Sequence, residues 1–266
     1  MDLLSLPIAV FCDVVCCRLS LKELVRLDGA FCCQNRSAWI ELLRSKQFTL
    51  HAPVDISHFY KRRWLLKRDV KVIDIEFARE LNVADVGETS KYLRAYGSSV
   101  RSVHFIGEDS TQEMNLTTIH CRKLTSVFIL NATLNSAYAS VLHYNPNIQH
   151  LDCEYLDYDV PNVMEGLSLH KLQSLRMVGI DAGTNKGCLW HESTHSDSLH
   201  TVIWDACSFE AGDLNALLKT CPQIRSLSCS NFAIGGSSSL ADNVLLMTRM
   251  INFSASYDIS LTDNDV

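Results

Sequence analysis

The sequence predicts an α/β solenoid, in which short parallel strands alternate with helices or turns, preceded by a helical N-terminal segment. Two observations predict this fold. The pattern Φ-x-x-Φ-x-Φ, where Φ is an apolar residue, recurs six times along the central half of the chain. Residues 3–48 instead place apolar residues at helical spacing and show no strand-like alternation. Because self-similarity at a fixed period is the signature of repeat architectures, each repeat is expected to form one strand and its return.

The six repeats keep a narrow period, since successive starts lie 24, 24, 24, 27 and 25 residues apart. In each repeat the last two apolar positions alternate with polar or variable ones, as in a strand that buries one face. The triples are Val100/Val103/Phe105, Leu124/Val127/Ile129, Ile148/Leu151/Cys153, Leu172/Leu175/Met177, Leu199/Val202/Trp204 and Ile224/Leu227/Cys229. An earlier triple, Val70/Ile73/Ile75, predicts a diverged capping repeat.

Helical spacing returns between several of these strands. An apolar stripe from Leu134 to Leu142 ends before Pro146, and Leu214, Leu217 and Leu218 repeat the arrangement. A similar stripe ends at Gly97, before the first strand of the series. The stretch 181–198 is rich in polar residues and is expected to form a loop or short turn.

The repeats, read as Leu-x-x-Leu-x-Leu with cysteine or asparagine at the turn, resemble the leucine-rich-repeat family. Residues 217–227 and 144–151 look especially like its cysteine-containing subtype, and the resemblance covers about residues 99–232. It implies short parallel strands on the concave side, helices or turns on the convex side, and a concave surface that binds a partner protein.

The N-terminal segment is similar to the F-box, the helical motif that docks on the adaptor subunit of cullin-type ubiquitin ligases. Leu6-Pro7, the apolar positions after it and Trp39 carry this resemblance. It implies that Leu6, Pro7, Val10 and Leu24 form or support the adaptor contact. The alternative is a plain helical cap on the solenoid.

Four segments follow from these patterns. Residues 1–50 are the F-box-like helical segment, and residues 51–98 are a linker with the diverged capping repeat. Residues 99–232 are the leucine-rich repeats, and residues 233–266 are a C-terminal cap with a frayed tail.

Strand geometry lists the side chains expected on the concave face, because alternate residues of a strand point to the same side. One column contains His104, Phe128, Asp152, Arg176 and Ile203, and the next contains Ile106, Leu130, Glu154, Val178 and Asp205. The large apolar members, closest together at Ile106, Phe128 and Leu130, are expected to be exposed and to bind a protein or peptide target. The alternative is that a loop or the tail covers them. Asp152 and Arg176 are expected to pair across neighbouring strands.

Two stretches carry groups that bind metals or anions elsewhere. Cys188-x-x-His191-x-x-x-His195 has zinc-capable groups, but no fourth ligand is apparent, so no metal site is predicted. The basic run Lys61–Arg68 is expected to be a solvated helix face with Trp64 and Leu65 turned inward, rather than a phosphate contact. The 11 cysteines are expected to be buried thiols.

The chain is predicted not to be an enzyme, and no cofactor or small-molecule substrate is expected. The sequence contains no Gly-rich phosphate loop, nucleophile elbow or His-Glu-x-x-His motif. A net charge of −6 argues against nucleic acid or anionic membrane as the partner and favours protein. The apolar start is too short for a signal or spanning segment, and adjacent cysteine pairs suit a reducing compartment. A cytoplasmic or nuclear location is therefore expected.

Overall fold

A computed structural model of the chain shows a mixed α/β protein whose strands run parallel. The chain divides into two compact units, residues 1–126 and 127–266, which are described separately. The structure describes residues 10, 19–31, 36–45, 48–78, 81, 83–107, 110–131, 133–134, 136–155, 157–158, 169–180, 190, 192–230, 233–235 and 252–256.

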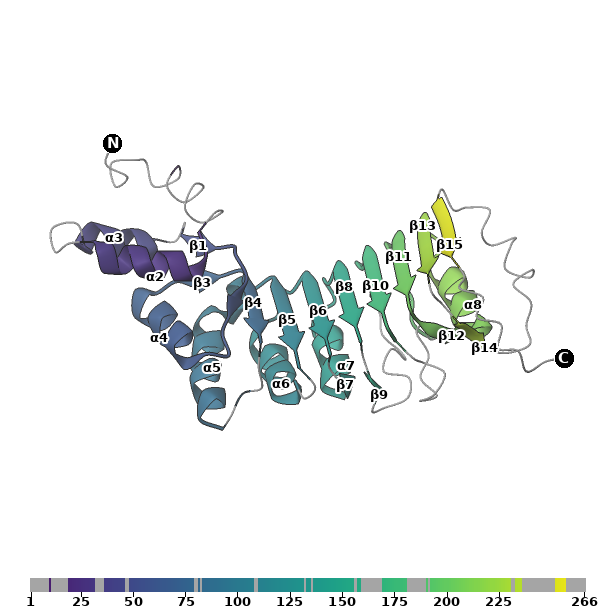
Figure 1. The fold of residues 1–266 in the computed structure, drawn as a ribbon, viewed down its shortest axis with the longest axis horizontal. Helices are drawn as coiled ribbons and strands as arrows, with labels where there is room; N and C mark the ends of the chain where they lie inside the picture. Colours follow the sequence, from purple (N-terminus) through teal and green to yellow (C-terminus); the bar gives the residue numbers. More distant parts are fainter. Residues whose placement is uncertain are drawn as a thin grey trace. The chain divides into compact units, whose positions relative to one another are not determined.

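Among the labelled elements of unit 1, two helices come first and alternating strands and helices follow (Figure 1). Its elements are α2 (Leu21–Ala30), α3 (Arg36–Leu43), β1 (Thr49–Leu50), β2 (Val54–Asp55), α4 (Phe59–Arg68), β3 (Lys71–Val72), β4 (Asp74–Phe77), α5 (Val83–Tyr96), the 3-10 turn η2 (Gly97–Ser99), β5 (Ser102–Ile106) and α6 (Thr111–His120). The order β2-β4-β5 forms its main sheet, and β1 pairs with β3. The helices predicted near the N-terminus and before Gly97 are therefore confirmed within the described residues.

Helix α2 starts where the sequence supplies a capping box. The backbone nitrogen of Glu23 donates to the Ser20 hydroxyl, and the backbone nitrogen of Ser20 donates to the Glu23 carboxylate over 2.7 Å. These two bonds satisfy amide groups that have no partner inside the helix. The helix then buries Leu21 and Leu24, which lie three residues apart on one face.

The predicted capping repeat exists, but its register was wrong by two residues. Ile75 pairs with Val103 and Phe77 with Phe105, so the triple equivalent to Val100/Val103/Phe105 is Val72/Ile75/Phe77. Ile75 and Phe77 are buried, whereas Ile73, which the prediction placed in the core, is half-buried. The rings of Phe77 and Phe105 stack at 5.7 Å and join the two strands on their core side.

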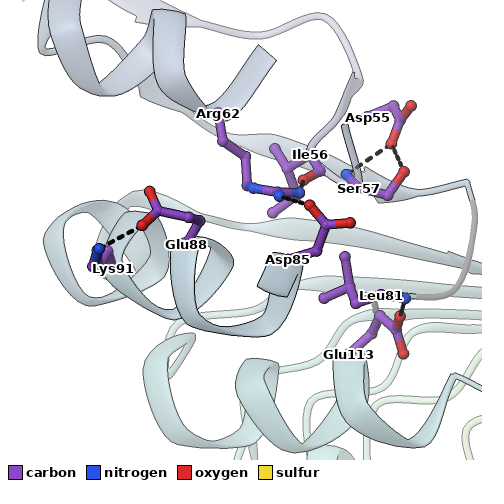
Figure 2. Close-up of polar contacts among 9 residues, drawn as sticks. All are labelled: Asp55, Ile56, Ser57, Arg62, Leu81, Asp85, Glu88, Lys91 and Glu113. Atoms are coloured by element: carbon purple, nitrogen blue, oxygen red, sulfur yellow. Dashed lines mark hydrogen bonds and ion pairs between the residues drawn. The ribbon is translucent and has the colours of Figure 1, made fainter. Parts of the chain in front are cut away.

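Buried polar groups hold the helices of unit 1 together (Figure 2). Arg62 on α4 is fully buried, donates to the carbonyl oxygen of Ile56 over 2.6 Å and pairs with Asp85 in the first turn of α5. Glu113 on α6 accepts the backbone N–H of Leu81 over 2.6 Å. The predicted solvated face of α4 is therefore wrong for Arg62, because a buried carboxylate compensates its charge.

The described part of unit 2 consists of parallel strands, with short strands or helices in several of the segments that join them (Figure 1). Its main sheet has the order β6-β8-β10-β11-β13-β15, with every pairing parallel in the registers that are resolved. The elements are β6 (Ser126–Leu130), β7 (Thr133–Leu134), α7 (Ser136–His143), β8 (His150–Glu154), β9 (Asp157–Tyr158), β10 (Ser174–Val178), β11 (Thr201–Asp205), β12 (Ser208–Glu210), α8 (Ala211–Thr220), β13 (Ser226–Ser230), β14 (Ala233–Gly235) and β15 (Asn252–Ser256).

The strand predictions for the six repeats are confirmed in position, since each strand carries the last two apolar residues of its triple. These residues are buried in every one of the six strands. Helix α7 packs on this core side, because the Tyr138 hydroxyl lies 3.8 Å from the sulfur of Cys153. The helices predicted over Leu134–Leu142 and at Leu214–Leu218 are α7 and α8.

A left-handed residue directly follows each of the strands β6, β8, β10 and β11 and joins it to the next strand. The backbone nitrogens of Asn131, Tyr155, Gly179 and Ala206 donate to the carbonyl oxygen of the last residue of the following strand, at 2.7–3.0 Å. All four have a positive φ, between 51° and 63°. Non-glycine residues rarely adopt this conformation, so the repeat holds three of them against a local preference.

The predicted C-terminal cap lies largely outside the described residues. Strand β15 is the described part that extends the sheet, pairing with β13 through Phe253 opposite Leu227. The series of strands predicted from the sequence ended one strand earlier, at β13.

Candidate functional site

The structure offers two candidate binding surfaces, one in each unit. The first is the strand face of unit 2, defined as Phe128, Leu130, Asp152, Glu154, Arg176, Val178, Ile203, Asp205, Ser228 and Ser230. The second is the α2–α4 hollow of unit 1, which the sequence did not predict. Each is built below from its own contacts.

The strand face is organised in two straight columns. Asp152, Arg176, Ile203 and Ser228 are register partners on four neighbouring strands. The second column runs through Glu154, Val178, Asp205 and Ser230 in the same registers. The predicted columns are therefore confirmed for these strands, and their spacing is that of adjacent strands, about 4.8 Å.

Arg176 forms ion pairs with two carboxylates of the strand face. Its Nη1 donates to Asp152 Oδ1 over 3.0 Å and to Oδ2 over 3.2 Å, and it also pairs with Glu154. Hydrogen bonding to Glu154, together with the attraction of Asp152, raises the pKa of Arg176 above its usual value. The predicted Asp152–Arg176 pair is confirmed, and a second carboxylate joins it.

The charges of this face do not balance. Asp152, Glu154 and Asp205 are three carboxylates, and Arg176 is the one guanidinium among them. Asp205 accepts a hydrogen bond from the Ser230 hydroxyl over 2.6 Å, and this neutral donor leaves its negative charge in place. The face is acidic, with a paired arginine near its middle.

The apolar members of the face are less exposed than predicted. Phe128, Leu130 and Ile203 are half-buried, and Val178 is 7% exposed and belongs to the core. The expectation that Val178 is an exposed apolar residue was therefore wrong. The alternation of burial along β10 ends at its last residue, because Met177 and Val178 are both buried.

In unit 1 the corresponding positions are His104 and Ile106 on β5, and both are half-buried. The His104 Nε2 atom lies 3.1 Å from Asp74 Oδ1 on the neighbouring strand β4. Ile106 ends β5 immediately before Gly107. His104 is thus held by a carboxylate of its own unit.

Of the predicted adaptor residues, Leu6 and Pro7 lie outside the described residues. Val10 is 45% exposed, as a contact residue should be. Leu24 is fully buried, so it is a core residue of α2 and can support the predicted adaptor contact only through packing. Trp39, which also carries the F-box resemblance, is buried in α3.

The α2–α4 hollow has a volume of about 680 Å³ and lies beside these N-terminal helices. Its walls come from α2, α4 and the segment around β2, with the lining residues Ser20, Leu21, Lys22, Val25, Arg26, Pro53, Val54, Asp55, Tyr60, Lys61 and Trp64. Val25 is 40% exposed and Tyr60 is 83% exposed, so the hollow presents apolar groups to solvent.

The hollow combines apolar walls with positive charge. Lys22 and Arg26 are exposed on α2, and Lys61 on α4 pairs with Asp55 over 2.9 Å. Three cations therefore stand against one carboxylate. An apolar surface bordered by charge is typical of a protein-binding site, and here it matches a partner segment with apolar and acidic side chains.

The described cysteines are core thiols. Cys121, Cys153, Cys207, Cys221 and Cys229 are buried and unbonded to one another. Burial raises the pKa of Cys121, Cys153 and Cys229 to about 12, and that of Cys207 and Cys221 to about 11. Because only the thiolate is a good nucleophile or metal ligand, these five groups are inert at neutral pH.

Within the described part of the chain, every helix is too short or too polar to cross a bilayer. No model of a known protein family matches the chain, and no curated protein matches its sequence.

Proposed function

We propose that the chain is a non-catalytic leucine-rich-repeat protein that serves as the target-recognition subunit of a cullin-type ubiquitin ligase. In this proposal the N-terminal helices bind the ligase adaptor, and the strand face of unit 2 holds the target protein. The observation that carries the proposal is the register of the strand face, in which eight side chains from the four strands β8, β10, β11 and β13 stand in two columns. A flat array of aligned side chains suits a protein surface better than a small molecule.

The chemistry of the strand face supports a particular kind of target. Three carboxylates around one arginine favour a basic segment, which would approach under electrostatic attraction. Half-buried Phe128, Leu130 and Ile203 supply apolar area beside these charges. The expected target therefore presents lysine or arginine next to an apolar side chain.

The α2–α4 hollow supports adaptor binding, since one of its walls is α2, which carries the exposed Val25 and belongs to the segment that resembles an F-box. Co-purification of the full chain with adaptor and cullin subunits tests the proposal. Val25→Asp places a charge in the hollow and is expected to abolish recovery of the adaptor, as is Leu6→Asp combined with Pro7→Ala. Ile119→Asp is the matched control, because Ile119 is 59% exposed on α6 and is not part of the hollow.

The proposal fails if the wild type recovers no adaptor. It also fails if the Val25→Asp variant and the Leu6→Asp/Pro7→Ala variant both recover as much adaptor as the Ile119→Asp control. Target binding is tested separately with Ile203→Asp in the strand face. Its control is Tyr144→Asp, because Tyr144 is 50% exposed on the turn after α7. Once a target is captured, only the Ile203 variant should lose it.

A second candidate function is a ligase-independent repeat scaffold whose N-terminal helices only cap the solenoid. The contacts of Asp28 favour it, because this buried carboxylate of α2 binds Trp39 on α3 and both Trp64 and Arg68 on α4. Helices fixed in this way behave as part of the first repeats. Deleting residues 1–50 should then cause aggregation, and a soluble, well-folded truncation would count against this candidate.

A further inference from the structure

Two consecutive turns of unit 2 bring together three metal-capable side chains. His170 lies in the turn before β10, and His195 and Asp197 lie in the turn before β11. One ligand atom from each of the three residues lies within 4.8 Å of the other two. This cluster differs from the Cys188/His191/His195 set considered from the sequence, of which Cys188 and His191 lie outside the described residues.

The repeat explains why these residues meet. His170 stands four residues before β10 and Asp197 four residues before β11, so they occupy equivalent positions in neighbouring repeats. The same position is Pro146 before β8 and Pro222 before β13. Two repeats thus replace a turn proline with a histidine and an aspartate, and the 27-residue repeat between them supplies His195.

The backbone beneath the cluster is fixed. The backbone nitrogen of Leu169 donates to the carbonyl oxygen of His195 over 3.2 Å, which ties the two turns directly. The fully buried Ser196 hydroxyl donates to the carbonyl oxygen of Leu172 over 3.1 Å. The three side chains therefore extend from a rigid pair of turns, as a preorganised site requires.

One of the distances in the cluster already fits the coordination of a small divalent ion. His170 Nδ1 lies 3.2 Å from Asp197 Oδ2, and His195 Nε2 lies 4.0 Å from the same oxygen. Two tetrahedral ligands at about 2.0–2.1 Å from zinc are about 3.3–3.4 Å apart, so one pair already has the required spacing. The His195 side chain is 43% exposed and has room to close the remaining gap.

We propose that His170, His195 and Asp197 bind a divalent transition-metal ion of the zinc class. Two imidazoles and one carboxylate select such ions over magnesium or calcium, which prefer oxygen ligands. Water completes the coordination, because all three side chains are exposed to solvent. The ion clips two consecutive turns of unit 2 together, and this role is independent of the proposed ligase function.

The test is a Co²⁺ titration of the full, metal-stripped and reduced protein, followed by absorption. Wild type is expected to bind one ion at this site with weak visible bands typical of nitrogen and oxygen ligands. Intense near-ultraviolet bands would instead indicate cysteine thiolates. His170→Gln, His195→Gln and Asp197→Asn should each weaken the visible-band binding by about tenfold or more, since even outer-shell changes cost about 10- to 100-fold.

His200→Gln is the matched control, because His200 is an exposed histidine three residues from Asp197 that is not part of the cluster. It should bind Co²⁺ as the wild type does. A second readout is the melting temperature, which Zn²⁺ should raise for the wild type and the control but not for Asp197→Asn. Absence of visible-band binding in the wild type overturns the proposal, and so does equal binding by the three ligand variants or equal loss in the control.

Discussion

Asp28 on α2 accepts a hydrogen bond from Arg68 on α4 over 2.8 Å, although the two residues are 40 positions apart. The Asp28 side chain is 7% exposed, so the pair forms away from bulk water. The indole nitrogens of Trp39 and Trp64 also donate to this carboxylate, at 3.1 and 3.2 Å. One buried acid therefore joins three helices of unit 1.

Replacing Asp28 with alanine is expected to lower the free energy of unfolding of unit 1 by about 3 kcal/mol. The reason is that a partly buried arginine and two indole N–H groups lose an acceptor at once. Urea titration followed by tryptophan fluorescence measures the change. Glu41→Ala, at an exposed carboxylate of α3, is the control and should leave the midpoint nearly unchanged. Equal stability of the two variants would contradict the assigned role of Asp28.

The same carboxylate should make unit 1 sensitive to acid. Burial opposes the charge on Asp28, but hydrogen bonds from Arg68, Trp64 and Trp39 outweigh it, so its pKa lies below the usual value. A group with a lowered folded-state pKa stabilises the fold above the pKa of the unfolded chain, about 3.9 for aspartate. That stability is lost as the pH falls below about 4 toward the folded-state pKa.

The measurement compares wild type with Asp28→Asn by urea titration between pH 7 and pH 3. The difference in unfolding free energy should be largest and constant above pH 5 and should shrink at lower pH. Glu41→Gln should show no such trend. A difference that is the same at pH 3 and pH 7 would show that the charge on Asp28 does not matter.

The strands of the repeats could be predicted because each buries two residues at a fixed offset, and this local signal recurs six times. The capping repeat shows the limit of that signal. Val70/Ile73/Ile75 and Val72/Ile75/Phe77 both fit the apolar pattern, and only pairing with β5 selects the second. The sequence pattern did not predict strand β2, because the residue at its first apolar position is His51.

The candidate site was partly predictable for a related reason. The columns of the strand face follow from strand periodicity, and so does the Asp152–Arg176 pair. The burial of Val178 does not follow from strand periodicity, because alternation along β10 places Val178 on the same side as the half-buried Arg176. The α2–α4 hollow depends on contacts between helices about 40 residues apart, and no local pattern encodes such a contact.

The buried pair of Arg62 and Asp85 should show strong coupling. Arg62→Met leaves Asp85 charged and 6% exposed, with an expected cost of about 3–5 kcal/mol. Adding Asp85→Asn removes the buried charge that faced Arg62, so the double variant should be more stable than Arg62→Met alone. A urea titration of both single variants and the double variant measures the coupling. Strictly additive effects would mean that the pair contributes no interaction energy.

Gly179 is needed for two reasons that can be separated. Its φ is 63°, a conformation that costs a non-glycine residue about 1–2 kcal/mol. A Cβ at this position would also lie 2.5 Å from the Tyr155 ring on the preceding strand end. Gly179→Ala should therefore lower the free energy of unfolding by about 2 kcal/mol, and by only about 1 kcal/mol when Tyr155 is already alanine.

Gly107 provides the matched comparison, because its φ is 129° and nothing lies within 4 Å of a Cβ placed there. Gly107→Ala should thus carry a backbone cost alone, unchanged by Tyr155→Ala. Urea titration of the wild type, the two single variants and the double variant at each glycine separates backbone strain from ring contact. If Tyr155→Ala gives Gly179→Ala no relief, strain alone explains the glycine. The left-handed strand end would then tolerate Tyr155 and Ala206 only because the hydrogen bond to the next strand compensates their strain.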